Sequence, residues 1–124
     1  MPVHLNHTIV AARDKRESAA FLTEILGLAP PTTYGPFAVV ELANDVSLDF
    51  IDDPEIHARH YAFLVSEEEF DEIFGRIRER GLDFWADPFQ RHPGRINTND
   101  GGRGVYWHDP DGHVLEIITR PYGG

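Results

Sequence analysis

The sequence predicts an α+β fold in which a β-α-β-β-β unit occurs twice within one domain spanning residues 1–124. Amphipathic segments indicate helices, and short apolar runs bounded by turn residues indicate strands. The order of these elements also repeats. In each half, a strand that carries a histidine precedes a helix ending in Gly-Leu, and we place the two halves at about residues 1–55 and 56–124.

Two helices are expected, at residues 14–27 and 66–80. The second has the clearer signals, because Ser66 followed by Glu69 forms a capping box. Apolar residues then recur with the i, i+3, i+4, i+7 spacing of one helical face, at Phe70, Ile73, Phe74 and Ile77. Gly81 follows at the position where a helix usually ends.

The remaining apolar segments are short and predict strands separated by Pro, Gly, Asn and Asp turns. We expect these strands at Leu5–Val10, Phe37–Leu42, Ser47–Ile51, His60–Val65, Asp83–Ala86, Gly104–His108 and Val114–Thr119. The polar stretch Asp87–Arg103 has no periodicity and is expected to be a loop, either a substrate lid or a solvated connection.

Composition excludes several classes of function. The chain has 21 acidic and 11 basic residues and a net charge of -10, which disfavours binding to nucleic acid or to an anionic membrane surface. It has no cysteine, so disulfides, thiolate catalysis and cysteine zinc sites are absent. Neither a spanning apolar run nor a signal peptide is visible, and we therefore expect a cytoplasmic protein that acts on a small molecule.

Four side chains that can bind a metal fall at matching positions of the two halves: His7, Asp49, His60 and Glu116. Alternation along each strand places them on one face, opposite the apolar residues that pack against the helices. Imidazole and carboxylate groups suit a divalent metal ion (Fe, Mn, Zn or Ni). Asp49 is the shortest of the four and is either a ligand or a neighbour that reaches the metal through water.

A simpler interpretation of each residue also exists, in which a buried Glu116 pairs with an arginine and the histidines are ordinary strand residues. Glu116 lies between Leu115 and Ile117, where an unpartnered carboxylate is unfavourable. The coincidence of all four residues at positions related by the repeat favours the metal site.

The run Gly104–Glu116, together with the opening residues 5–10 and the segment His60–Val65, resembles the vicinal oxygen chelate superfamily. This superfamily includes glyoxalase I, extradiol dioxygenases, and fosfomycin- and bleomycin-resistance proteins. The resemblance implies an incomplete barrel of paired modules around a divalent metal held by His7, His60 and Glu116. The family's fourth glyoxalase-type ligand, more often Glu, falls on Asp49. It also implies a homodimer in which each site is built from both chains.

The resemblance implies a reaction of the glyoxalase, lyase or isomerase type, in which a metal binds neighbouring substrate oxygens and stabilises an enolate-like intermediate. Asp49 or Glu116 would act as the base, and Tyr106 would donate a hydrogen bond to the substrate.

Three alternatives remain open. An extradiol ring-cleaving dioxygenase fits Tyr106, ten residues before Glu116, but its expected histidine is missing at 97–99. Fosfomycin-type transfer would need cations from Arg91, Arg95 and Arg103. A non-catalytic drug-binding resistance protein would not need the metal ligands.

Overall fold

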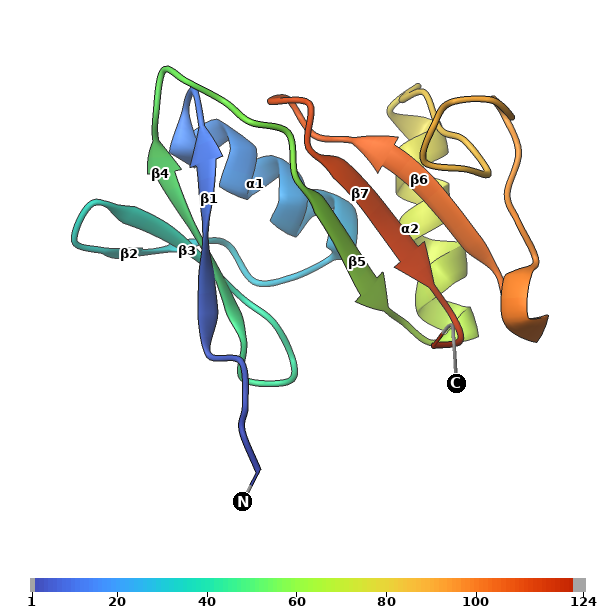
Figure 1. Ribbon diagram of the computed structural model, residues 1–124, viewed down its shortest axis with the longest axis horizontal. Coiled ribbons are helices and arrows are strands. Elements are labelled where there is room, and N and C mark those ends of the chain that lie inside the picture. Colours follow the sequence, from blue (N-terminus) through green and yellow to red (C-terminus); the bar gives the residue numbers. More distant parts are fainter. Residues whose placement is uncertain (1, 122–124) are drawn as a thin grey trace. The chain divides into compact units, whose positions relative to one another are not determined.

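The computed structural model of the protein describes residues 2–121 (Figure 1), and the chain divides between His57 and Ala58 into two compact units. The first unit contains β1 (His7–Ala12), α1 (Lys15–Leu26), β2 (Thr32–Tyr34), β3 (Phe37–Glu41) and β4 (Ser47–Asp52). The second unit contains β5 (His60–Leu64), α2 (Glu67–Glu79), the 3-10 turn η1 (Asn99–Gly101), β6 (Gly104–His108) and β7 (Val114–Ile118).

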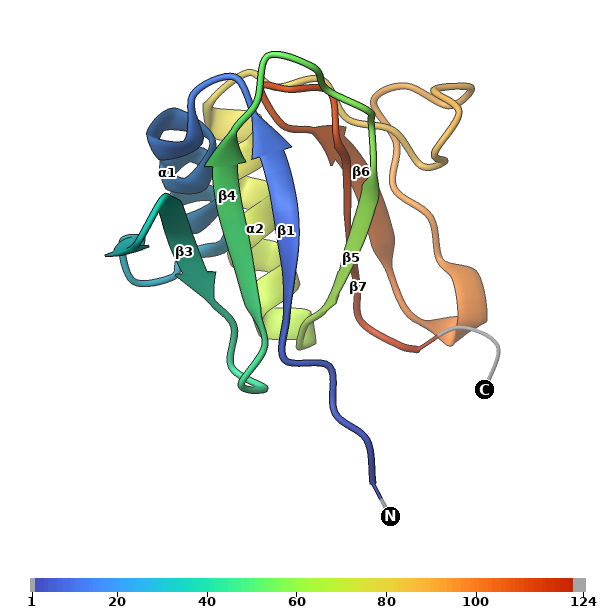
Figure 2. The same ribbon diagram turned by 60° about the vertical axis from the view of Figure 1, so that its left-hand side comes forward.

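The first unit is a four-stranded sheet with one helix on it (Figure 2). The strand order is β1-β4-β3-β2, with β1 parallel to β4 and the other pairs antiparallel. Helix α1 contacts β3 and β4. The Asp14 side chain caps its first turn, and Gly27 ends it with a φ of 74°, so the predicted helix is confirmed at both ends.

The second unit is a three-stranded sheet of order β5-β7-β6 and the helix α2. Strand β5 is parallel to β7, which is antiparallel to β6. Both hydrogen bonds of the predicted capping box are present at the start of α2, between Ser66 and Glu69. The apolar face of α2 is buried through Phe70, Ile73 and Ile77, as its periodicity predicts.

Three strand predictions need correction. Residues 83–86 do not form a strand. Trp85 makes only isolated bridges, one to Pro93 and one to Tyr106, and Pro93 lacks the N–H that a continuing ladder requires. Strand β2 was not predicted because it is short, exposed and lacks apolar alternation. Strand β1 begins and ends two residues later than expected. The first unit is therefore a complete β-α-β-β-β unit, whereas in the second an isolated bridge takes the place of one strand.

The core of each sheet follows the predicted alternation. In β1, Val10 and Ala12 are buried while His7 and Ile9 are exposed, and in β7 both Leu115 and Ile117 are buried. Over residues 2–121, no helix combines the length and the hydropathy needed to cross a bilayer.

Candidate metal centre

His60 and Glu116 lie on neighbouring parallel strands of the second unit and meet directly. His60 opens β5 opposite Val114, and Glu116 lies in the middle of β7 opposite Ala62. The Nε2 atom of His60 is 3.0 Å from Oε1 of Glu116. The Glu116 side chain is only 3% exposed, and that of His60 is 43% exposed. The sequence prediction that these two residues share a site is consistent with this contact.

The hydrogen bonds of His60 fix which ring nitrogen is available. Its Nδ1 atom is 3.2 Å from the carbonyl oxygen of Val114, and because a carbonyl can only accept, Nδ1 carries the proton. In the neutral ring, Nε2 is then an acceptor that faces another acceptor, the Glu116 carboxylate. Such a pair needs a cation, which is either a proton on the ring or a metal ion.

The spacing of the two atoms fits a metal ion. Metal bonds to a histidine nitrogen and a carboxylate oxygen are about 2.1 Å long, so two ligands stand about 3.0 Å apart at the right angle of an octahedral site, which Mn²⁺ prefers, and about 3.4 Å apart at the tetrahedral angle of zinc. The observed separation is 3.0 Å. The backbone bond to Nδ1 is the kind of support that metal-binding histidines usually have. The two residues therefore fit a divalent metal both in chemistry and in spacing.

His7 and Asp49 lie in the first unit. The β1–β4 register places His7 beside Ser47 and Ile9 beside Asp49, so His7 and Asp49 share one face of the sheet. The Nδ1 atom of His7 is 2.7 Å from the Asn6 side-chain oxygen. Asp49 is buried and accepts a hydrogen bond of 2.8 Å from the Ser47 hydroxyl.

The four predicted ligands thus divide two and two between the units. Neither unit, over the residues described, gathers three His, Asp or Glu side chains into one cluster. Membership of His7 and Asp49 in the site therefore stays a prediction.

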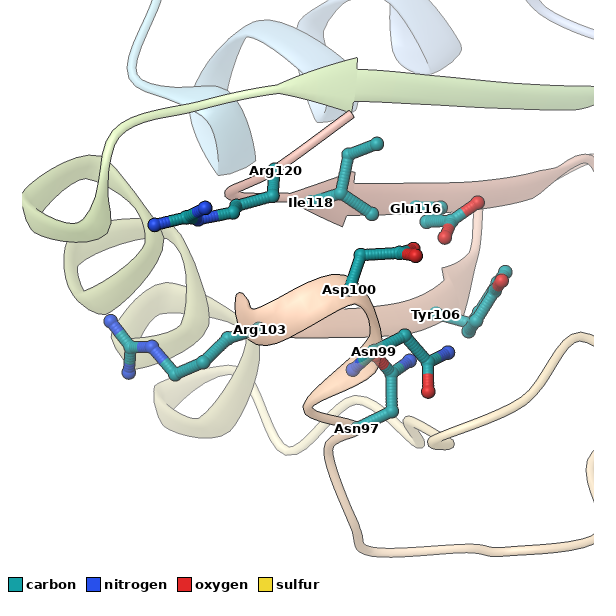
Figure 3. A pocket seen from close by; sticks show the side chains of 8 residues that line it. All are labelled: Asn97, Asn99, Asp100, Arg103, Tyr106, Glu116, Ile118 and Arg120. Carbon is teal, nitrogen blue, oxygen red and sulfur yellow. The ribbon is translucent and has the colours of Figure 1, made fainter. Parts of the chain in front are cut away.

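A cavity of about 370 Å³ opens in the second unit beside Glu116 (Figure 3). It is lined by Asn97, Asn99, Asp100, Arg103, Tyr106, Glu116, Ile118 and Arg120. In Figure 3 the Asp100 side chain points toward Glu116, whereas the guanidinium groups of Arg103 and Arg120 point away from it. The volume lies at the lower end of the range for small-molecule sites.

Tyr106 lines the same cavity as Glu116. It lies directly opposite Glu116 in the β6–β7 ladder, and its ring stacks on that of His60 with centroids 5.9 Å apart. Its neighbour Trp107 is fully buried on the other face of the strand. As alternation along the strand predicts, only one of the two aromatic rings faces the cavity.

Asn97 and Asp100 were not among the predicted site residues. Asn97 pairs with Gly104 through backbone bonds of 2.9 and 3.0 Å, which close a hairpin over the cavity. Asp100 and Gly101 at its tip have φ values of 57° and 76°. The Asp-Gly pair is a known signal for such a turn and was the available clue.

Arg103 lines the cavity but is bound elsewhere. Its guanidinium contacts Glu67 at 2.7 Å and Asp71 at 2.8 Å, and it lies 4.3 Å from the centre of the Phe70 ring. Hydrogen bonds from Thr119 and from Arg103 lower the pKa of Glu67. Arg103 therefore holds α2 to β6, and it is a poor candidate for binding an anionic substrate group.

Comparison with known proteins identifies the family. The model of the Glyoxalase/Bleomycin resistance protein/Dioxygenase superfamily matches residues 4–117. The chain belongs to this superfamily. The α+β fold class predicted from the sequence is thereby confirmed.

Three relatives of this superfamily member are informative. The solved structure of "Oxidase ChaP-H1" is 68% identical, covers 99% of this chain and 100% of its own, and has a TM-score of 0.97. The structure of "Oxidase ChaP-H2" is 64% identical, covers 100% and 98%, and also has a TM-score of 0.97. The "Glutathione transferase FosA" of Serratia marcescens is 30% identical over 120 residues, which are 91% of this chain and 78% of that protein.

Proposed function

We propose that the protein is a divalent-metal-dependent oxidase that uses dioxygen to oxidise a small molecule bound through two neighbouring oxygen atoms. The observation that carries the proposal is the His60–Glu116 pair, in which two hydrogen-bond acceptors face each other at 3.0 Å and Glu116 lines a cavity. The choice of reaction rests on the two relatives named as oxidases, which are 68% and 64% identical to this chain.

We assign the metal to His60 and Glu116, with His7 as the third ligand. Asp49 is either a fourth ligand or a carboxylate that reaches the metal through water. Because His7 and the His60–Glu116 pair lie in different units, the proposal includes a homodimer in which one chain supplies His7 to the pair of its partner. When bound, the metal would chelate the substrate oxygens and stabilise the negative charge that develops on them.

The chain's own residues do the remaining work. Glu116, buried on β7, provides the negative charge that holds the cation, while the Val114 carbonyl keeps the His60 ring in the tautomer whose Nε2 faces Glu116. We propose that Tyr106, opposite Glu116, donates a hydrogen bond from its hydroxyl to a substrate oxygen. The hairpin that carries Asn97 and Asp100 forms another part of the wall of the cavity that Glu116 lines.

The stoichiometry of a two-electron oxidase is balanced with dioxygen as the oxidant. The substrate loses two electrons and two protons, and dioxygen takes up both to become hydrogen peroxide. In the ring-cleaving dioxygenase alternative, both oxygen atoms enter the product and no peroxide is released. The extradiol pattern has a histidine at 97–99, where this chain has Asn97, Thr98 and Asn99, and this weakens the dioxygenase alternative.

Two other reactions are weaker candidates. The lyase or isomerase reaction favoured from the sequence uses the same metal pair without dioxygen, but none of the three relatives described above carries such a name. Thiol transfer has the support of the 30% identity to a glutathione transferase. It would need a cation for the anionic group of its substrate, and Arg103 is already paired with Glu67 and Asp71.

The proposal is tested with protein loaded with Fe²⁺ under anaerobic conditions and then exposed to air-saturated buffer with a panel of catechols and α-hydroxyketones. We expect substrate-dependent oxygen uptake matched by peroxide. Labelled oxygen in the product would instead assign the dioxygenase reaction, and consumption of added glutathione without oxygen uptake would assign thiol transfer.

A second measurement does not require turnover. Catechol bound through both oxygens to the Fe³⁺-loaded protein should give a visible charge-transfer band. The band should be missing in the Glu116→Gln variant, and its absence from the parent protein would contradict oxygen chelation at this site.

A further inference from the structure

Three residues of the turn between β6 and β7 are buried, whereas Pro110 and Gly112, which lie between them, are exposed. Asp109, Asp111 and His113 are all less than 10% exposed, and His113 is only 1% exposed. One oxygen of Asp109 accepts hydrogen bonds of 2.9 Å from the backbone amides of Asp111 and His113. The Asp109 amide in turn donates to the His113 carbonyl at 3.1 Å. His113 is therefore held in a fixed position.

The side chain of His113 bonds to the residue that precedes His60. Its Nδ1 atom accepts a hydrogen bond of 3.0 Å from the backbone amide of Arg59. The Arg59 carbonyl accepts one of 2.8 Å from the Val114 amide. Both backbone polar groups of Arg59 are thus held by consecutive residues of the same segment. Because Nδ1 accepts, the neutral ring carries its proton on Nε2.

This side-chain bond stands where the β-ladder stops. Strand β5 begins at His60, and the parallel pairing with β7 begins at Val114. Gly112, the residue before His113, lies in the turn with a φ of 84°. The Arg59 amide therefore bonds to an imidazole nitrogen instead of a backbone carbonyl, and the pairing is extended by one residue beyond the strand. In Figure 1 this turn lies at the end of the sheet where β5 begins.

We infer that His113 is a positioning residue for the metal site, acting through the Arg59 amide to hold the backbone that carries His60. The inference rests on the proposed function, in which His60 is a ligand. His60 is then anchored at two points, because its backbone follows the held Arg59 peptide and its Nδ1 bonds to the Val114 carbonyl at 3.2 Å. A ring supported in this way presents Nε2 to the metal with little rotational freedom.

The test compares three kinds of variant. His113→Leu keeps the approximate size of the side chain but removes the acceptor. His113→Asn restores an acceptor, because its side-chain oxygen occupies a position similar to that of Nδ1. Ile77→Val and Ile77→Ala on α2 are controls, since Ile77 is buried in the same unit and belongs to the apolar face of the helix. Ile77→Val should cause a small loss of stability and Ile77→Ala a larger one, so the two controls span the loss expected from a change at a buried position such as His113.

The first readout is the affinity and visible spectrum of Co²⁺ bound to each protein. We expect His113→Leu to weaken Co²⁺ binding by roughly 10- to 100-fold and to alter the spectrum, and His113→Asn to bind within about threefold of the parent. The Ile77 variants should bind Co²⁺ as tightly as the parent does, even though their folded states are less stable. Parent-like binding by His113→Leu would overturn the inference, as would an Asn variant no better than the Leu variant.

The second readout is the hydrogen exchange of the Arg59 amide in the metal-free proteins. We expect exchange at least about tenfold faster in His113→Leu than in the parent, and near-parent protection in His113→Asn. Unchanged protection in the Leu variant would overturn the inference without any reference to metal. If the parent itself binds no Co²⁺, the proposed function fails, and the role of His113 in the metal site fails with it.

Discussion

Replacing Glu116 by Gln removes one negative charge from the cavity wall while keeping the shape of the side chain. The new amide has nearly the same size and geometry as the carboxylate, and its N–H can donate to Nε2 of His60 across the same 3.0 Å contact. The metal-free variant should therefore fold with unchanged or slightly raised stability, because a charge that is only 3% exposed is no longer buried.

The metal-bound state responds in the opposite way. With metal at a hundred times its dissociation constant, binding adds about 2.7 kcal/mol to the free energy of unfolding of the parent. For a chain of this length, that corresponds to a rise of roughly 10 °C in the unfolding midpoint. A variant that binds at least about 100-fold more weakly gains no more than about 0.4 kcal/mol at the same metal concentration, or roughly 2 °C.

Thermal unfolding followed by circular dichroism, with and without Mn²⁺, measures both effects. The expected result is a large metal-dependent shift in the parent and almost none in Glu116→Gln, from nearly equal metal-free midpoints. A variant that retains the full shift would refute the assignment of Glu116 as a ligand. A variant that no longer folds without metal would refute the view that the amide replaces the carboxylate in the contact with His60.

Other expectations follow from local contacts. Ser66→Ala removes one bond of the capping box and should lower the free energy of unfolding by about 1 kcal/mol in a urea titration; an unchanged midpoint would contradict the role of the cap. Bonds from the Ser66 backbone and hydroxyl lower the pKa of Glu69 below 4.5, so its stabilising contribution is present above that pH and is lost as the pH falls through the lowered pKa. Glu69→Gln should therefore flatten the acid limb of the stability profile, and an unchanged acid limb would contradict the assignment. In Gly104→Ala, the new Cβ would lie 2.8 Å from the Asn97 side-chain oxygen, so we expect a loss of about 1–3 kcal/mol and faster exchange of the Asn97 amide, whereas parent-like stability would mean that the hairpin adjusts freely.

The sequence was sufficient for features set by nearby residues. Both helices were predicted because their signals are local, such as the Ser66–Glu69 box and the left-handed Gly27. The faces of the strands were predicted because alternation is a property of the strand itself. His60 and Glu116 are farther apart in the chain; they were predicted to share a site because each matches a metal-capable residue of the first half, His7 and Asp49, and the two atoms lie 3.0 Å apart.

Features set by distant partners were not predictable in the same way. The segment 83–86 has the pattern of a strand, but only Trp85 pairs, with Tyr106 on one side and with Pro93, which has no N–H, on the other. The hairpin tip that carries Asp100 borders the cavity only because Asn97 pairs with Gly104. The role of Arg103 depends on acidic residues of α2 that lie more than thirty positions earlier in the chain.

The measurement that tests the proposed metal centre most directly is anomalous scattering from crystals grown with Mn²⁺ or Fe²⁺. We predict one strong peak within bonding distance of both His60 Nε2 and Glu116 Oε1. His7 should be the third ligand of the same metal ion. A fully occupied metal at another position, with no anomalous peak between His60 and Glu116, would contradict the proposed metal centre.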